Sequence, residues 1–404
     1  MKHLKTTWLI FILVISLWSC KEEVISPLGD TTVEVFENAN LYFDMAFKSG
    51  PSPIQDSILR LDAGRVILKK VKIPSYKLQT KATVQVLLTS NGDPWDKSGS
   101  LFVIPVDTEL SLLDFEDGSF DLAQRNETYP AITPFSKDSL HYIPNVELLR
   151  FMTPFGVGHF NDSERIKDRK PIYIPHWEEE VTWSQDISHL LPLLQDEVYI
   201  GVFIDTWTKE GYNISVALDF DESDFPNHTG KKQGILPLVN TIKYASAQRL
   251  FDSFSKDTLT VDFSINTPFK NAKLHYITTG HGGHGGGDEF VKKENQITLD
   301  GTLIKSFIPW RDDCASFRRF NPTSATWPAN VIMKEETSTE HIASSDFSRS
   351  NWCPGSDVVP EVIPLENLTP GDHKLTIAIP EAQVATETEN NYWMVSAYIT
   401  YDLE

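Results

Sequence analysis

Short runs of alternating or β-branched residues recur along most of the chain, and they constrain the fold more than any other feature. Gly, Pro, Asn and Asp clusters separate the runs, and long helical periodicity is scarce. Many short strands without intervening helices are typical of β-sandwiches and jelly rolls. We therefore predict an all-β fold. The predicted strands are residues 66–73, 82–88, 101–106, 198–205, 212–220, 258–265, 273–278, 373–379 and 393–401.

A chain of 404 residues is too long for a single sandwich, so we expect two adjacent antiparallel jelly-roll domains. The polar stretch 221–234 is the best boundary between them. We predict a tether over residues 20–35, an N-terminal domain over 36–232 and a C-terminal domain over 233–404. Residues 178–194 suggest a short helix or turn.

The N-terminus reads as a targeting segment. Lys2 and Lys5 precede an apolar run that is too short to span a membrane and that ends before Cys20. We predict a lipoprotein signal peptide over residues 1–19 and a lipid anchor on Cys20, which would be the only contact with a membrane. The protein would then be an outer-membrane or cell-surface lipoprotein. The alternative is an ordinary secretory signal, which would give a secreted protein.

Acidic residues outnumber basic ones by 56 to 36, and the formal net charge is −20. Nucleic-acid binding depends on basic patches, so this balance argues against a nucleic-acid partner. A neutral partner such as a sugar fits this charge. The sequence carries no signal for oligomerisation, and we expect a monomer.

Once Cys20 is assigned to the anchor, Cys314 and Cys353 remain as an even pair in an exported chain. A bridge between them would close a loop of about 40 residues and stabilise the fold by roughly 4 kcal/mol. The alternative is two free, buried thiols.

The stretch 280–289, GHGGHGGGDE, has two interpretations. His281, His284, Asp288 and Glu289 could hold a metal ion, because imidazole and carboxylate groups suit zinc. Alternatively, the glycines leave room for a bulky substrate beside a carboxylate. No His-Glu-x-x-His helix is present and a glycine-rich cage is floppy, so we predict neither a metal nor another cofactor.

Acids and tryptophans occur together at two further places, Trp95-Asp96-Lys97 and Asp205-Thr206-Trp207. Sugars stack their apolar faces on aromatic rings while carboxylates accept hydrogen bonds from their hydroxyls. Each group also has a structural alternative. Asp96 could cap its own turn, Glu289 could be a solvated loop acid, Arg349 could form a surface ion pair, and Trp207 and Trp352 could be core aromatics.

Taken in order, these segments resemble the peptide-N-glycosidase F family, bacterial amidases that release N-linked glycans from asparagine. The matching segments are residues 95–97, 150–154 (RFMTP), 205–207, the loop 280–290 with Glu289-Phe290, and 349–355 (RSNWCPG). The resemblance implies two side-by-side jelly rolls with a site in the cleft between them. It also implies one disulfide, Cys314–Cys353.

The resemblance assigns roles residue by residue. Asp96 matches the essential aspartate and Glu289 the second-domain glutamate, while Asp205 stands where the family commonly has glutamate. Lys97 replaces a usual arginine, and the insertion 107–146, a surface loop or a lip, has no recognised counterpart. The residues that resemble catalytic ones are Asp96, Glu289 and Asp205, and the expected substrate contacts are Arg349, Trp207, Trp95, Trp352, Lys97 and His281.

The implied reaction is hydrolysis of the amide between asparagine and the innermost N-acetylglucosamine of N-linked glycoproteins or glycopeptides. It releases the intact glycan and leaves aspartate. One alternative is a non-catalytic glycan-binding surface lipoprotein. Another is a glycosidase, which would leave the first N-acetylglucosamine on the peptide.

Overall fold

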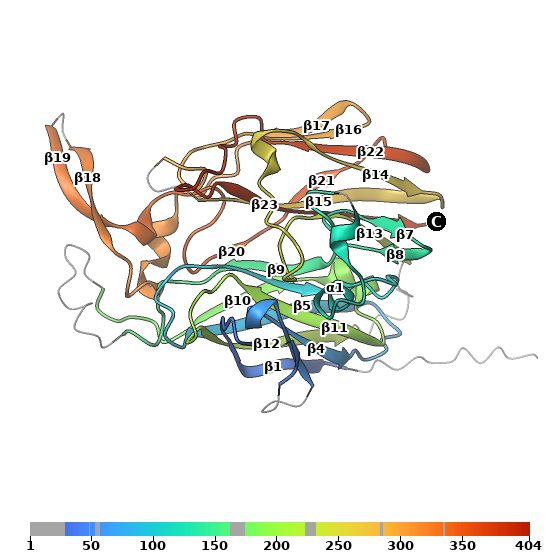
Figure 1. The fold of residues 1–404 in the computed structure, drawn as a ribbon, viewed down its shortest axis with the longest axis horizontal. Helices are drawn as coiled ribbons and strands as arrows, with labels where there is room; N and C mark the ends of the chain where they lie inside the picture. Colours follow the sequence, from blue (N-terminus) through green and yellow to red (C-terminus); the bar gives the residue numbers. More distant parts are fainter. Residues whose placement is uncertain are drawn as a thin grey trace, which may run out of the picture.

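The computed structural model describes residues 29–47, 49–52, 57–125, 127–161, 174–222, 232–282, 286–333 and 336–404. The predicted signal peptide and Cys20 lie outside these residues. The described chain forms two antiparallel β-sandwiches that lie one against the other (Figure 1). The predicted all-β fold of two adjacent jelly rolls is therefore confirmed. In the described ranges, no helix is both long and apolar enough to cross a bilayer.

The first sandwich consists of a four-stranded and a seven-stranded sheet. The four-stranded sheet contains, in spatial order, β1 (Thr31–Leu41), β12 (Tyr212–Glu222), β5 (Thr80–Ser90) and β10 (Val181–Asp186). The seven-stranded sheet contains β2 (Gly50–Pro51), β3 (Ile58–Leu61), β4 (Val66–Lys72), β11 (Glu197–Ile204), β6 (Ser98–Val103), β9 (Val146–Met152) and β20 (Asp357–Val358). Strand β20 belongs to the second half of the sequence, so the chain crosses back to complete this sheet.

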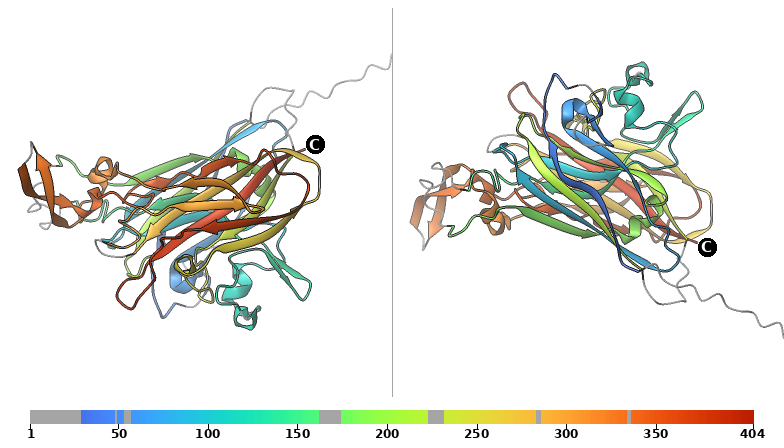
Figure 2. Two further views of the ribbon diagram at one scale, coloured as in Figure 1. Left: turned by 90° about the horizontal axis from the view of Figure 1, so that it is seen from above. Right: turned by 90° about the horizontal axis from the view of Figure 1, so that it is seen from below.

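The second sandwich consists of two four-stranded sheets. The first contains β13 (Gln233–Asn240), β23 (Tyr392–Leu403), β15 (Phe269–His281) and β21 (Glu361–Pro364). The second contains β14 (Leu259–Ile265), β22 (Gly371–Ala378), β16 (Asn295–Leu299) and β17 (Thr302–Phe307). A hairpin of β18 (Thr326–Met333) and β19 (Glu336–Ala343) projects from one end of the molecule (Figure 2).

Helical structure is limited to one α-helix and six short 3₁₀ segments in the described ranges. The predicted helix or turn over 178–194 is strand β10 followed by a 3₁₀ segment. The helical elements are α1 (Leu112–Glu116), η1 (Asp62–Gly64), η2 (Leu122–Arg125), η3 (Ser188–Leu193), η4 (Ser253–Ser255), η5 (Cys314–Phe320) and η6 (Ser344–Asp346).

Burial along the strands explains which sheet lies in the middle of the molecule. Strand β5 alternates, with Val84, Val86 and Leu88 turned into the first core and Lys81 and Gln85 facing outward. Strands β6 and β9 are buried at every position. In a strand that is covered on both faces, buried and solvent-exposed residues no longer alternate. The seven-stranded sheet therefore packs on its own sandwich with one face and on the second sandwich with the other.

A buried ion pair joins the two sandwiches. Arg150 and Glu147 of β9 are paired, and neither side chain is exposed. The Arg150 guanidinium also donates to the Met394 carbonyl at 2.7 Å and to Ser396 Oγ at 3.3 Å, both on β23. Arg150 thus links β9 of the first sandwich to β23 of the second.

The segment 107–146 is a brace between the sandwiches. It contains α1 and a hairpin of β7 (Phe135–Lys137) and β8 (Leu140–Tyr142), and it lies on the flank of the molecule (Figure 2). Tyr129 packs edge-to-face on Phe251 at 4.7 Å, and the Ile132 carbonyl accepts from the Asn240 backbone. The insertion, predicted to be an extra surface loop or a lip, thus packs on the second sandwich.

Candidate active site

The predicted site residues lie at strand ends that come from both sandwiches. Asp96 is in the loop between β5 and β6, and Asp205 directly follows β11. Glu289 follows β15, after the glycine-rich stretch, and Tyr392 begins β23. Strand β15 pairs with β23 so that His281 is opposite Tyr392. The two sandwiches thus present their loops to the same end of the molecule.

A buried aspartate shapes the loop that carries Asp96. Asp93 has no exposed surface, and its carboxylate accepts from the Trp95 backbone at 3.0 Å and from Thr206 Oγ1 at 2.7 Å. This Asx turn is the capping role that the sequence had left open for Asp96. The Asp96 side chain is therefore free to face the second sandwich.

Thr153, which follows β9, and Tyr212 of β12 hold the same loop. The Thr153 hydroxyl accepts from the Lys97 backbone at 2.8 Å, and the Tyr212 hydroxyl donates to the Trp95 carbonyl at 2.6 Å. From the second sandwich, Thr323 donates to the Pro94 carbonyl at 2.6 Å. These bonds to main-chain groups on either side of Asp96 place its carboxylate on a rigid support.

Close backbone packing explains two glycines of the loop 280–289. A Cβ atom on Gly280 would lie 2.8 Å from the Trp393 ring, and one on Gly282 would lie 2.0 Å from the Asn390 carbonyl oxygen. Gly282 also has a φ of +93°, which disfavours other residues. Substitution at either position would displace the segment that carries Glu289.

The adjacent acids Asp288 and Glu289 have different surroundings. Asp288 is fully buried and accepts from Trp393 Nε1 at 3.0 Å and from the Gln383 backbone at 2.9 Å. Glu289 instead accepts from Arg349 Nε at 2.9 Å. Asp288 therefore anchors the loop, and Glu289 is the acid that the loop presents.

Arg349 brings the acids of the two sandwiches together. Its Nη2 atom lies 3.7 Å from Asp96 Oδ2, and its side chain is only 2% exposed. Burial raises the pKa of Glu289 to about 7, and the neighbouring Asp96 carboxylate adds to this rise while Arg349 opposes it. Burial also raises the pKa of Asp96, against the opposing effects of Arg349 and Lys97. One cation beside two partly buried carboxyls makes them titrate as a coupled pair, in which Glu289 holds its proton up to about pH 7.

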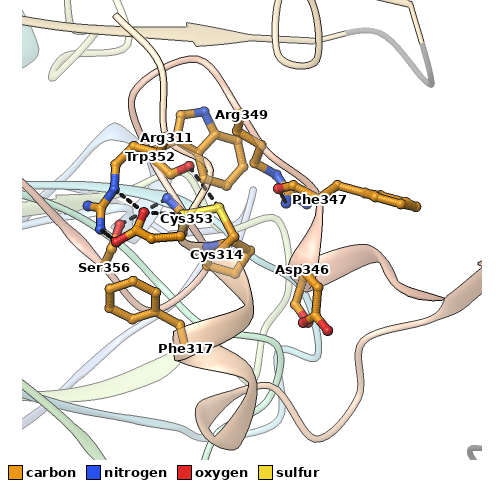
Figure 3. Close-up of a disulfide and its surroundings, with 12 residues drawn as sticks. Arg311, Cys314, Phe317, Asp346, Phe347, Arg349, Trp352, Cys353 and Ser356 are labelled. Atoms are coloured by element: carbon orange, nitrogen blue, oxygen red, sulfur yellow. Dashed lines mark hydrogen bonds and ion pairs between the residues drawn. A yellow bond between two sulfur atoms is a disulfide. The ribbon is translucent and has the colours of Figure 1, made fainter. Parts of the chain in front are cut away.

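A disulfide holds the segment that carries Arg349 (Figure 3). Cys314 and Cys353 are bonded, with a Cα–Cα distance of 5.1 Å, so the predicted bridge is confirmed. Trp352 next to it is 4% exposed and stacks on the Arg349 guanidinium, with 4.8 Å between the guanidinium carbon and the ring centre. Trp352 therefore lies beneath Arg349 and supports it.

Asp205 lies apart from this pair and has a different cation. Its Oδ1 atom is 3.1 Å from Arg65 Nη1, and 27% of its side chain is exposed. Burial raises the pKa of Asp205, while Arg65 and Lys97 lower it. Because Lys97 also lowers the pKa of Asp96, its ammonium group lies in the field of both acids. The first sandwich thus supplies two acids, Asp96 and Asp205, which share the field of Lys97 but pair with different arginines.

Two tryptophans next to these acids are exposed. Trp95 and Trp207 have exposed fractions of 55% and 57%, and Trp207 packs on Phe43 with 5.0 Å between ring centres. An exposed indole face beside carboxylates is a surface on which a sugar ring can stack.

We expect Trp207→Ala to weaken the binding of a short oligosaccharide about tenfold, because the change removes a ring face on which a sugar can stack. Calorimetric titration measures the affinity. Trp327→Ala is the matched control, since Trp327 is 51% exposed on the projecting hairpin. Equal affinities of wild type and Trp207→Ala would contradict a role of Trp207 in sugar binding.

His281 lies in the floor of the site between two aromatic rings. It stacks on Tyr392 at 5.0 Å and on Trp352 at 5.6 Å, and burial lowers its pKa to about 3. The imidazole is therefore neutral. His284 lies outside the described residues. Among the residues that the structure describes, no three His, Cys, Asp or Glu side chains are grouped as metal ligands.

Sequence reasoning missed three residues of this region, Arg65, Asp93 and Tyr392. Burial raises the pKa of Tyr392, and the carboxylates of Asp205 and Glu289 add to the rise, so its hydroxyl keeps its proton. Asp93 could have been found as the first residue of an Asp-Pro turn. Arg65 and Tyr392 are far from the other site residues in sequence, and no local pattern marks them.

Two family profiles match the chain. One, Peptide-N-glycosidase F, N terminal, covers residues 32–220. The other, Peptide-N-glycosidase F, C terminal, covers residues 250–400. A search of curated proteins gave no match.

Solved structures show the same similarity. Two structures of PNGF-II are 35% and 36% identical to the chain, with TM-scores of 0.77 and 0.78 over 93% of it. The chain spans only 66% and 65% of the length of those proteins. PNGase F, a glycosylasparaginase from Flavobacterium meningosepticum, is 14% identical with a TM-score of 0.57, covering 93% of this chain and 96% of that one. At this identity, the likeness to PNGase F concerns the fold alone.

Proposed function

Because the chain belongs to the peptide-N-glycosidase F family, we propose that it hydrolyses the amide between asparagine and the innermost N-acetylglucosamine of N-linked glycans. The observation that carries this proposal is the position of Arg349. It lies between Asp96 of the first sandwich and Glu289 of the second. A glycan-binding protein needs no such pair of acids across a domain boundary.

Hydrolysis of an amide requires a base for water and an acid for the leaving nitrogen, each typically contributing roughly 10²–10⁴-fold. Asp96 takes a proton from the attacking water, whose oxygen adds to the carbonyl carbon to give a tetrahedral intermediate. The C–N bond breaks when this intermediate collapses and the carbonyl re-forms. Glu289, whose pKa is raised to about 7, gives its proton to the departing nitrogen. The positive charge of Arg349, which is buried between Asp96 and Glu289, stabilises through its field the negative charge that develops on the carbonyl oxygen. The products are aspartate and a glycosylamine, which then loses ammonia to water.

The sugar end of the substrate fits the residues around Asp205. Asp205 accepts hydrogen bonds from sugar hydroxyls, and Trp207 and Trp95 offer their exposed ring faces. The Lys97 ammonium lies in the field of both Asp205 and Asp96. Trp352 and His281 lie deeper and support Arg349 and Tyr392. N-linked glycoproteins and glycopeptides are thus the proposed partners.

We expect kcat/KM of the wild type to fall as the pH rises above about 7, because Glu289 then loses the proton it must donate. The value of kcat/KM falls with rising pH because a general acid is active only below its pKa. Glu289→Gln cannot transfer a proton, so its residual activity should lack this alkaline limb. A pH profile of kcat/KM for both proteins tests this. If Glu289→Gln kept the same alkaline limb, the limb would have to arise from the titration of another group.

Product analysis by mass spectrometry tests the proposed function. A glycopeptide incubated with the protein should yield a peptide with aspartate in place of asparagine, together with the intact glycan. A peptide that keeps one N-acetylglucosamine would show a glycosidase. Tight binding with no product would favour the glycan-binding lipoprotein, which is the second candidate.

The compartment is also part of the proposal. A formed disulfide is typical of proteins outside the cytosol, where N-linked glycoproteins would be met. The signal peptide, the anchor on Cys20 and the monomeric state stay predictions.

A further inference from the structure

Arg65 connects the two elements of the proposed sugar end. It is 5% exposed and directly precedes β4. Its Nη1 atom is 3.1 Å from Asp205 Oδ1, and its guanidinium carbon lies 4.4 Å from the ring centre of Trp207. The same side chain therefore touches the carboxylate and covers one face of the indole, while Trp207 is 57% exposed.

A second, buried acid fixes the other side of the guanidinium. Asp62 Oδ2 lies 2.5 Å from Arg65 Nη2, and Asp62 is 2% exposed. Asp62, Ala63 and Gly64 all have positive φ, of 47°, 55° and 92°. Backbone strain of this kind persists only where surrounding contacts hold it. A Cβ on Gly64 would lie 2.5 Å from the Tyr42 carbonyl oxygen, so the turn is tightly enclosed.

The brace 107–146 holds this turn in place. Glu116, at the end of α1, accepts from the Asp62 backbone at 2.7 Å through Oε1. Its Oε2 atom accepts from the Ser246 backbone at 2.8 Å, and the Ser246 hydroxyl donates to Asp62 Oδ1 at 3.2 Å. Residue 246 follows β13 in the second sandwich. The turn that positions Arg65 is thus tied to both sandwiches.

We propose that Arg65 is a positioning residue for glycan binding, which holds the Asp205 carboxylate and the Trp207 ring in one sugar-binding arrangement. This inference rests on the proposed function. Arg65 is buried and already paired with Asp62 and Asp205, so it acts through its neighbours and not by touching the substrate. A planar guanidinium can bridge two carboxylates and stack on a ring at once, whereas a lysine ammonium is a point charge.

The proposed role of Arg65 predicts a change in the pH dependence of kcat/KM. Asp205 accepts hydrogen bonds from sugar hydroxyls best when it is ionised. Arg65 and Lys97 lower its pKa, while burial and Asp62 raise it. Loss of Arg65 therefore raises the pKa of Asp205, and the acid limb of kcat/KM should move to higher pH. A role of Arg65 in folding alone would not move this limb.

The test compares Arg65→Lys and Arg65→Met with wild type on a short glycopeptide. Loss of a hydrogen bond to a charged group should lower kcat/KM by roughly 10–100-fold, mainly through KM, and shift the acid limb upward in Arg65→Met. Arg60→Met is the matched control, because Arg60 is also 5% exposed but contacts the Tyr42 ring instead of the site. If Arg65→Met does not fold, the test is the increase in KM of Arg65→Lys over wild type.

Binding of N,N′-diacetylchitobiose, measured by calorimetry, separates this inference from the proposed reaction. Weaker binding to Arg65→Lys than to wild type and Arg60→Met supports the role of Arg65 even if wild type hydrolyses nothing. In that case the proposed hydrolysis would be wrong, and the role of Arg65 in glycan binding would stand. Unchanged affinity and KM in Arg65→Lys, or an equal loss in Arg60→Met, would overturn the inference.

Discussion

Asp96→Asn should abolish glycan release and leave the melting temperature close to that of the wild type. The change removes the base and keeps the shape of the side chain, so we expect kcat to fall by roughly 10²–10⁴-fold. Stability should hold because Asp93, and not Asp96, caps the loop. Loss of one buried acid also removes repulsion from Glu289.

Single-turnover kinetics with a glycopeptide measures this effect, and Asp262→Asn is a matched control. Asp262 lies on β14 with 78% of its side chain exposed, and it should behave as wild type. Substantial turnover by Asp96→Asn would move the proton transfer to another group. An equal loss in Asp262→Asn would point to a fault in the assay or the fold.

Arg150→Met should be the most destabilising of the substitutions considered. It leaves the Glu147 carboxylate buried without its cation, and breaking a buried pair in this way costs about 3–5 kcal/mol. It also removes the donors to Met394 and Ser396 on β23, so the contact between the sandwiches weakens. Denaturant unfolding measures the change in free energy.

Two further variants separate this effect from a general loss of charge. Glu147→Gln combined with Arg150→Met removes both charges, so it should recover part of the stability lost in Arg150→Met. Lys70→Met breaks an exposed pair with Glu197 of 2.9 Å and should cost less than about 1 kcal/mol. Equal losses in Arg150→Met and Lys70→Met would contradict the structural role of the buried pair.

Several strands with one solvent-exposed face were predicted from the sequence, although β10, which also alternates, was interpreted as a short helix or turn. Strands β5, β12 and β14 alternate between buried and less buried positions, and each was predicted. Strand β9 was missed, because it is buried on both faces and carries Glu147 and Arg150 in place of a period-two pattern. Its polar residues are explained only by the second sandwich, which no local window of sequence can show.

The site residues also differ in whether the sequence could reveal them. Asp96, Glu289 and Arg349 were identified by resemblance to a family, and the structure brings these three together. The sequence left open that Asp96 caps its own turn, and the structure gives this role to Asp93. Arg65 reaches Asp205 over 140 positions of sequence, and only the fold shows this contact.

Hydrolysis in heavy-oxygen water is the most direct test of the central claim, that acids from two sandwiches activate water at the asparagine–sugar amide. We expect the new aspartate of the peptide to contain one heavy oxygen atom, and the released glycan to keep its innermost N-acetylglucosamine. Heavy oxygen on a sugar carbon, with N-acetylglucosamine still bound to the peptide, would contradict the proposed reaction.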